Sequence, residues 1–306
     1  MTQQPIDKDL FRVVGANDDA SDKLAKKSAS FWREVFIRFS HNKMAIVGLI
    51  VLTIIIAMAI LMPIFSQYKY SDQLGVYNSP PNAQFWFGTD DLGRDIFVRI
   101  WAGAQISLFI GITAALIDLV IGVLWGSISG LVGGRVDNIM MRIADVLTAV
   151  PYLLVVIVLI VVLQPGIIPM IIALSITGWI NMARIVRGEV LSIKNQEYVL
   201  AARTLGASTG HLIMKHLIPN ALGAILVTMT LTIPSAIFTE AFLSYLGLGV
   251  PAPKASWGTM ASDGNKAIAD YPWRLIFPAV FISLTIFAFN AIGDGLRDAL
   301  DPKLRK

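Results

Sequence analysis

The sequence predicts an all-α polytopic membrane protein with six transmembrane helices. Of its 306 residues, 55% are hydrophobic and only 15% are charged, and the mean hydropathy is +0.66, which lies outside the range of soluble globular domains. A helix needs about 20 apolar residues to cross a hydrocarbon core, and runs of this length recur along the chain. The predicted spans cover residues 44–65, 104–132, 144–163, 166–185, 221–246 and 273–292.

The N-terminal part of the chain is polar before the first span. Residues 1–30 are mixed in charge and poor in aromatics, so they bury too little apolar surface to fold alone. Residues 31–43 carry an apolar helical stripe formed by Phe31, Val35 and Phe39, which is typical of an amphipathic helix lying on the membrane. The predicted division is therefore a cytoplasmic tail with this interfacial helix, 1–43, and a transmembrane domain, 44–306.

Small residues and a proline indicate how the spans pack. The second span contains three glycines at four-residue spacing, which lets another helix approach closely: Gly122, Gly126 and Gly130. Pro151 is expected to kink the third span. Only two residues separate this span from the fourth, so the two should form a tight antiparallel pair.

The distribution of lysine and arginine predicts the topology. With a cytoplasmic N-terminus, the inside segments hold nineteen Lys and Arg residues and the outside segments hold six, which follows the positive-inside rule. Both termini and the segment 197–220 are then cytoplasmic, and the loops 66–100 and 247–272 are extracytoplasmic. Topology explains the net charge of +4, so nucleic acid is not an expected partner.

No metal, cofactor or catalytic site is expected in this chain. Cysteine is absent, and the three histidines, His41, His211 and His216, are too scattered for a metal site. The phosphate-binding pattern G-x-x-x-x-G-K-[ST] does not occur, since the nearest run, Gly206 to His211, lacks the lysine. No cluster of nucleophile and base lies at one depth, which argues against a membrane-embedded enzyme.

Two ionisable residues lie within the predicted spans. Asp118 is in the second span and Glu240 is in the outer half of the fifth. Because a charge in lipid is costly, each is a functional candidate, here for the translocation path. An interhelical hydrogen bond inside the bundle is the equally weighted alternative for both.

The tract EYVLAARTLGASTGHLIMKHLIPN, residues 197–220, interrupts the apolar spans of the second half; we call it the coupling segment. It predicts a short helix over 197–205, a stop at Gly206, and a second helical stretch leading to Pro219. Ala201 and Ala202 are small enough to let another surface come close.

This spacing resembles the EAA motif of bacterial ABC-importer permease subunits. Leu200 replaces the usual glutamate and Ile218 the usual leucine, while Glu197 lies three residues too early to be that glutamate. The resemblance implies that the segment contacts separate ATPase subunits. The residues expected to do so are Glu197, Ala201, Ala202, Leu205, Gly206, Pro219 and Asn220.

Three further tracts narrow the resemblance. FGTDDLGRD (87–95), SWGTM (256–260) and GDGLRDALDP (293–302) look like signatures of the dipeptide, oligopeptide and nickel branch, most closely its C-type permease subunits. In the first tract a self-stabilised turn at the outer entrance is favoured over a direct substrate contact. Its candidate residues are Gly88, Asp90, Gly93, Arg94 and Asp95.

The resemblance implies the permease fold of an ABC type I importer in a bacterial inner membrane. The expected function is import of oligopeptides or dipeptides, with nickel or another small solute as the alternative substrate. The implied partners are a homologous B-type permease subunit, two ATPases that carry ATP and Mg²⁺, an extracytoplasmic peptide-binding protein and the lipid bilayer. An ion-coupled secondary transporter is the rival class, although no inverted repeat is visible.

Overall fold

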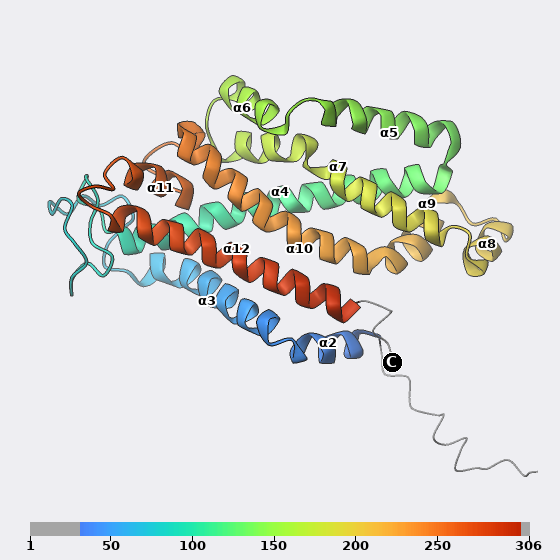
Figure 1. The fold of residues 1–306 in the computed structure, drawn as a ribbon, viewed down its shortest axis with the longest axis horizontal. Helices are drawn as coiled ribbons and strands as arrows, with labels where there is room; N and C mark the ends of the chain where they lie inside the picture. The colour runs from blue at the N-terminus through green and yellow to red at the C-terminus, as the bar shows by residue number, and fades with distance from the viewer. Residues whose placement is uncertain (1–30, 301–306) are drawn as a thin grey trace, which may run out of the picture.

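The computed structural model describes residues 31–300, and within that range the chain is helical apart from loops, turns and one isolated bridge, Thr89–Asp95. Its long helices run side by side along the long axis of the molecule (Figure 1). The elements are α2 (Phe31–His41), α3 (Lys43–Phe65), α4 (Ile96–Val132), α5 (Gly134–Ala149), α6 (Tyr152–Leu163), α7 (Ile167–Ile193), α8 (Glu197–Thr204), α9 (Thr209–Leu212), η2 (Ile213–Leu217), α10 (Ile218–Leu243), η3 (Ser244–Leu248), α11 (Trp257–Asn265) and α12 (Trp273–Leu300).

The predicted all-α membrane fold is confirmed. Among the described residues, five helical stretches are long and apolar enough to cross a membrane, and a sixth is added if α5 and α6 form one broken span. The first predicted span coincides with α3. The fourth and sixth extend further than predicted, to Ile193 and Leu300, because both helices continue beyond the apolar core as amphipathic turns.

The predicted start of the second span is wrong. We expected helix from residue 104, but α4 begins at Ile96, and the outer loop therefore ends at Asp95 rather than at 100. The Asp95 side chain caps the helix by accepting a hydrogen bond from the Phe97 backbone N–H at 2.8 Å. The first turns of α4 are buried and, apart from Arg99, apolar, and the charge of Arg99 interrupts the apolar run of the second span.

The third predicted span is a broken helix rather than a kinked one. α5 and α6 meet at an angle of 78° across Val150 and Pro151. Since α6 has only 12 residues, it is too short to cross a bilayer by itself, and the pair is either one broken span or a re-entrant loop. Such breaks are tolerated at membrane depth where the backbone is buried in protein or lines a polar cavity.

The glycine face of α4 packs against α7. A Cβ at Gly122 would lie 2.6 Å from the Met182 Cβ, and one at Gly130 would lie 2.8 Å from the Val190 Cγ1. Larger side chains at these positions would push the helices apart. The predicted close approach is confirmed, and its partner is the fourth span.

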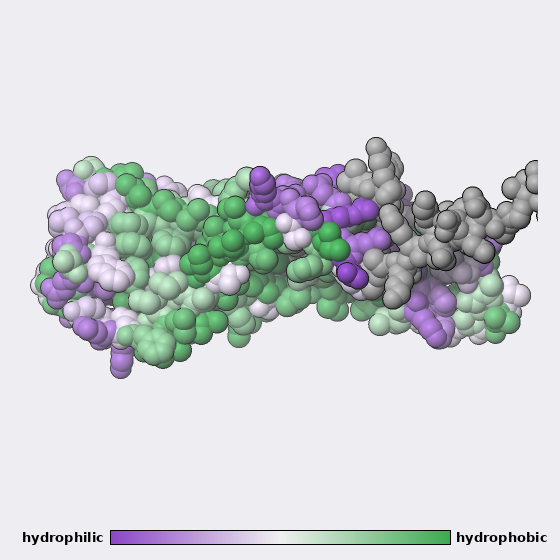
Figure 2. Space-filling model, turned by 90° about the horizontal axis from the view of Figure 1, so that it is seen from below, coloured by the Kyte–Doolittle hydropathy of each residue, from purple (hydrophilic) through white to green (hydrophobic). Residues whose placement is uncertain are grey.

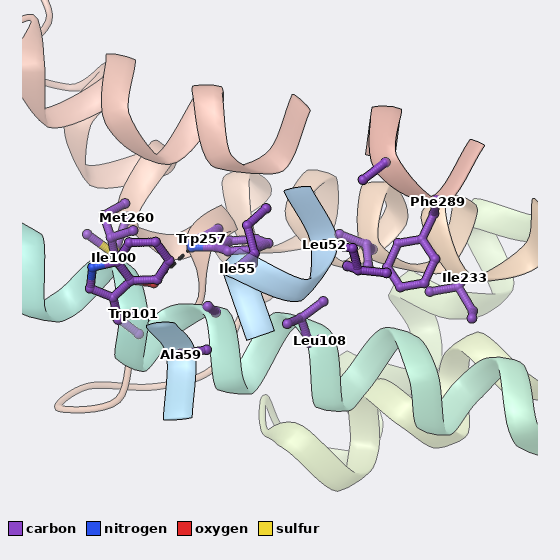
Figure 3. Close-up of a cluster of buried hydrophobic side chains, with 14 of the residues drawn as sticks. Leu52, Ile55, Ala59, Ile100, Trp101, Leu108, Ile233, Trp257, Met260 and Phe289 are labelled. Carbon is purple, nitrogen blue, oxygen red and sulfur yellow. Dashed lines mark hydrogen bonds between the residues drawn. The ribbon is translucent and has the colours of Figure 1, made fainter. Parts of the chain in front are cut away.

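A cluster of buried side chains joins α3, α4, α10, α11 and α12 (Figure 3). One of its members, Trp257, is fully buried and donates from Nε1 to the Ile100 carbonyl at 2.9 Å. α11 lies inside the predicted loop 247–272, where no helix was expected. Ser256 and Thr259 start this helix with a capping box, a signal that is present in the sequence.

Apolar surface fills the middle of the face shown in Figure 2, and hydrophilic residues gather toward its ends.

The amphipathic helix predicted over 31–43 corresponds to α2, in which Val35 is buried and Trp32 and Phe36 are exposed. Asn42, which caps α3, donates to the Asp298 carboxylate at 3.3 Å, so this corner is attached to α12. The predicted tail 1–30 lies outside the described residues.

Candidate functional site

The coupling segment folds as its sequence predicts. α8 ends where Gly206 takes a φ of +85°, and the Ala207 N–H donates to the Ala202 carbonyl at 3.1 Å. Glycine adopts this left-handed turn without strain. Val199 is buried in the same apolar cluster as Leu217, which attaches α8 to the helical stretch leading into α10.

Most of the coupling segment is exposed at one end of the molecule, opposite α11 (Figure 1). Leu205 is 88% exposed, and Tyr198 and Met214 also expose large apolar side chains. Clustered exposed apolar groups are typical of a protein interaction surface. Of the residues expected to contact an ATPase, Ala202 is half-buried, and the others are exposed: Glu197, Ala201, Leu205, Gly206, Pro219 and Asn220.

At the opposite end, a buried ion-pair cluster holds the outer tract 87–95 together. Asp90 accepts hydrogen bonds from the Arg94 backbone N–H at 3.0 Å and from its Nε at 2.7 Å. The Arg99 Nε lies 3.4 Å from the same carboxylate, and all three side chains are buried. A self-stabilised turn is what the sequence predicted, whereas a direct substrate contact stays a prediction.

The remaining candidates of this tract shape the turn. Gly88 and Gly93 have φ angles of +77° and +72°, which favour glycine. Burial raises the pKa of the Asp95 carboxyl above its ordinary value of 3.8, although hydrogen bonds from the Phe97 and Val98 backbones oppose the shift. Asp95 thus acts as a helix cap in this structure.

Glu240 is completely buried and has hydrogen-bond partners at both carboxylate oxygens. Ser107 on α4 donates to Oε2 at 2.9 Å, and Ser244 donates to Oε1 at 2.8 Å. The Ser107 hydroxyl also accepts from the Trp257 backbone N–H at 3.2 Å. The structure therefore shows the interhelical hydrogen bonding that was one of the two alternatives for Glu240, and its place on a translocation path stays a prediction.

Asp118 lies near the middle of the helix bundle, in a cavity of about 290 Å³ between α4, α6, α7 and α10. Its side chain is 4% exposed, and Oδ1 is buried without a hydrogen-bond partner among the described residues. A Cβ at Gly178 would overlap the carboxylate, so the glycine makes room for it. The other polar residues lining the cavity are Tyr152, Asn181, Thr228, Thr232, Ser235 and Thr239.

Residues 122–306 match the family described as binding-protein-dependent transport system inner membrane component, and residues 30–82 match the N-terminal transmembrane domain of oligopeptide transport permease C. The chain belongs to this permease family. It is therefore a multi-pass membrane transport permease of the oligopeptide and dipeptide C type, as the motifs predicted.

Curated relatives are similar in sequence to this permease over nearly its whole length. It is 65% identical to the oligopeptide transport system permease protein OppC of Bacillus subtilis over 99% of this chain and 100% of the relative. It is 56% identical to the dipeptide transport system permease protein DppC of the same organism over 94% of this chain and 90% of the relative. OppC of Escherichia coli K12 is 44% identical to it over 94% of this chain and 96% of the relative.

Solved structures support the fold of the permease. A chain of the MetNI methionine ABC transporter in an inward-facing conformation superposes with a TM-score of 0.53, covering 67% of this chain and 98% of that chain at 17% identity. At this identity the likeness concerns the fold alone.

The structure also brings forward residues that sequence reasoning missed. Gly178 and Tyr152 complete the cavity around Asp118, and Ser107 and Trp257 complete the surroundings of Glu240. A glycine beside a threonine in the middle of the fourth span was the available signal for Gly178. For Ser107 there was none, because it lies 133 residues from Glu240 along the chain.

Proposed function

We propose that this permease imports oligopeptides or dipeptides into the cytoplasm with energy from separate ATPase subunits. The observation that carries the proposal is the exposed coupling segment, with Leu205 at its tip, on a chain whose relatives are named as oligopeptide and dipeptide permeases. The names of those relatives support a peptide substrate over nickel. In this proposal ATP and Mg²⁺ bind to the ATPase subunits and not to the permease.

The shape of the coupling segment suits the transmission of force. α8 is short and is attached to α10 through Val199, and the Gly206 turn fixes the direction in which Leu205 projects. A partner that grips Leu205 and Tyr198 therefore moves α10 and the adjoining helices as it opens and closes. Two ATPases contact this segment here and its counterpart in a B-type permease subunit.

The other proposed partners follow from the ends and faces of the molecule. The outer loops, predicted as 66–100 and 247–272, receive peptide from an extracytoplasmic binding protein, and both termini are cytoplasmic, in accordance with the charge bias. Asn181 and Ser235 are exposed on the isolated chain at the depth of the spans. Polar side chains are unfavourable against lipid, so the second permease subunit covers this face.

The test compares two glycines of the coupling segment in the complete transporter. Gly206→Val places a β-branched residue at a φ of +85°, which is strained whatever the available space. Gly210 has no positive φ and has open space around it, so Gly210→Val is the matched control. We expect Gly206→Val to lower peptide uptake about tenfold or more while ATP hydrolysis and complex assembly persist, and Gly210→Val to lower uptake less than about twofold.

Three measurements decide the result: uptake of a labelled peptide, ATP hydrolysis, and the amount of assembled complex. Unchanged uptake in Gly206→Val would contradict the coupling role. Uptake by the unmodified transporter that survives ATP depletion would favour the ion-coupled class instead, and uptake of nickel without uptake of peptide would favour the alternative substrate.

A further inference from the structure

The cavity between α4, α6, α7 and α10 holds the buried carboxylate of Asp118. Its Oδ1 has no hydrogen-bond partner in the described part of the chain, and Asp118 is the one charged side chain among the described residues that line the cavity. Burying a charge without compensation is unfavourable. A ligand with complementary charge would supply what the protein does not.

Three of the five hydroxyl-bearing residues that line the cavity present acceptors to it. Thr228, Thr232 and Thr239 donate their hydroxyl hydrogens to backbone carbonyls of α10 at 2.7, 2.9 and 2.8 Å. A hydroxyl has a single hydrogen, so these oxygens have only lone pairs left for the cavity. The lining therefore favours a ligand that donates hydrogen bonds and carries positive charge.

Two kinds of cation can be compared with this lining. A divalent metal ion needs six or more oxygen ligands, often including several carboxylates, and one carboxylate is present here. A primary ammonium has three donors and no acceptor, which matches a carboxylate surrounded by hydroxyl oxygens. The volume of about 290 Å³ is close to the lower limit of roughly 300 Å³ for ligand pockets, enough for the end of a peptide.

We propose that Asp118, with the hydroxyl oxygens of α10, receives a primary ammonium group of the transported peptide as it passes through the membrane. This inference rests on peptide import as the proposed function. The ammonium belongs either to the peptide's N-terminus or to a lysine side chain. The peptide's C-terminal carboxylate is excluded from this position by the charge of Asp118.

The test uses the complete transporter with its binding protein in proteoliposomes and three labelled peptides. The first is a short alanine peptide with a free amine, the second its Nα-acetylated form, and the third an Nα-acetylated form with one lysine, each supplied at a concentration that saturates the binding protein. Asp118→Asn keeps the shape of the side chain and removes its charge. Because the binding protein is the same in both complexes, its own preference cancels in the comparison.

We expect Asp118→Asn to lower uptake of the free-amine peptide about tenfold or more, and uptake of the acetylated alanine peptide by less than about twofold. A similar loss for the lysine peptide would show that the site takes any primary ammonium, and no loss would restrict it to the N-terminus; either supports the site. Equal losses for all three peptides, or no loss, would overturn it. The inference would also be overturned if uptake of every peptide required sodium and Asp118→Asn abolished this requirement, because the ligand of Asp118 would then be a metal ion.

A second variant keeps the test decisive if Asp118→Asn does not assemble. Thr232→Val removes one acceptor oxygen from the same cavity and leaves the carboxylate in place, and we expect a loss of about threefold to tenfold for the free-amine peptide alone. An unmodified transporter that imports no peptide would contradict the proposed function. If the unmodified transporter imports all three peptides and both variants show the same preference among them as the unmodified transporter, this inference alone would be contradicted.

Discussion

Asp118 and Glu240 are both acidic side chains buried in the membrane-spanning helices, but their surroundings are opposite. Each carboxylate oxygen of Glu240 accepts a hydrogen bond from a serine hydroxyl. Asp118 has a cavity in front of it and no partner for Oδ1 among the described residues. Glu240 therefore has its hydrogen bonds supplied by the protein, whereas Oδ1 of Asp118, in the described part of the chain, does not.

The difference separates a structural acid from a candidate functional one. The network of Glu240 includes Ser107 on α4 and the backbone of Trp257 on α11, so it joins three elements at the outer half of the bundle. Among the described residues Oδ1 of Asp118 has no hydrogen-bond partner, so its burial costs stability. An acid in that position is explained by what it contacts during transport rather than by what it holds together.

The most direct way to break this comparison is to replace each acid by an apolar side chain of similar length. Glu240→Met leaves the hydroxyls of Ser107 and Ser244 buried without their acceptor, and unsatisfied buried groups cost about 1–3 kcal/mol each. We expect the thermal midpoint of the purified complex to fall by several degrees, since about 1 kcal/mol corresponds to roughly 2–4 °C for a chain of this size.

The matched variant, Asp118→Leu, should leave the thermal midpoint unchanged or raise it, because it removes a buried charge whose Oδ1 has no hydrogen-bond partner among the described residues. Its uptake of the free-amine peptide should still be lost. If both variants lowered the midpoint by the same amount, the two acids would have the same structural role, and the distinction drawn from their partners would be wrong.

A smaller change tests the role of Gly178, which lies against the Asp118 carboxylate. Gly178→Ala adds a methyl group that overlaps the Asp118 carboxylate and displaces it without removing its charge. We expect uptake of a free-amine peptide to fall by about tenfold, because misplaced charged hydrogen bonds lose most of their strength. Gly188→Ala on the same helix is the control, since a Cβ there meets nothing within 4 Å.

The two glycine variants should assemble to the same extent, and the rates are compared per assembled complex. Combining Gly178→Ala with Asp118→Asn should cost little more than either change alone, because both act on one interaction. A fully additive loss would mean that Gly178 matters for helix packing and not for the position of the carboxylate.

The parts of the fold that depend on local chemistry were predictable. Length and hydropathy located α3, and the Gly206 stop located the end of α8. The start of α4 was missed because Arg99 interrupts the apolar run at its N-terminus and because Asp95 was not recognised as its cap. The angle at Pro151 could not be predicted, since a proline permits a break but its neighbours set the size of the bend.

The candidate site was less predictable than the fold. Both intramembrane acids were identified by depth and cost, yet nothing in the sequence distinguishes the satisfied one from the other. The serine that satisfies Glu240 is remote in the chain, and the helix break that brings Tyr152 to the cavity of Asp118 depends on tertiary packing. Long-range pairing of this kind needs coordinates.

A third buried acid, Asp95, extends the comparison outside the spans, where backbone N–H groups are its partners. Asn caps helices as well as Asp does, so Asp95→Asn should keep the cap, whereas Asp95→Ala should cost about 1 kcal/mol. Burial raises the pKa of Asp95 above 3.8. The native state therefore binds more protons than the unfolded state between 3.8 and the raised value, and the contribution of Asp95 to stability falls as pH rises through that window.

Thermal midpoints of the complex measured from pH 4 to pH 7 would show this as a difference between variants. Relative to Asp95→Asn, the unmodified protein should lose stability with rising pH, the smallest of the effects expected here. An unmodified protein that gained stability over this range relative to Asp95→Asn would mean that the two backbone hydrogen bonds outweigh burial. Asp95 would then resemble Glu240, with partners sufficient to hold its charge, rather than stand between Glu240 and Asp118.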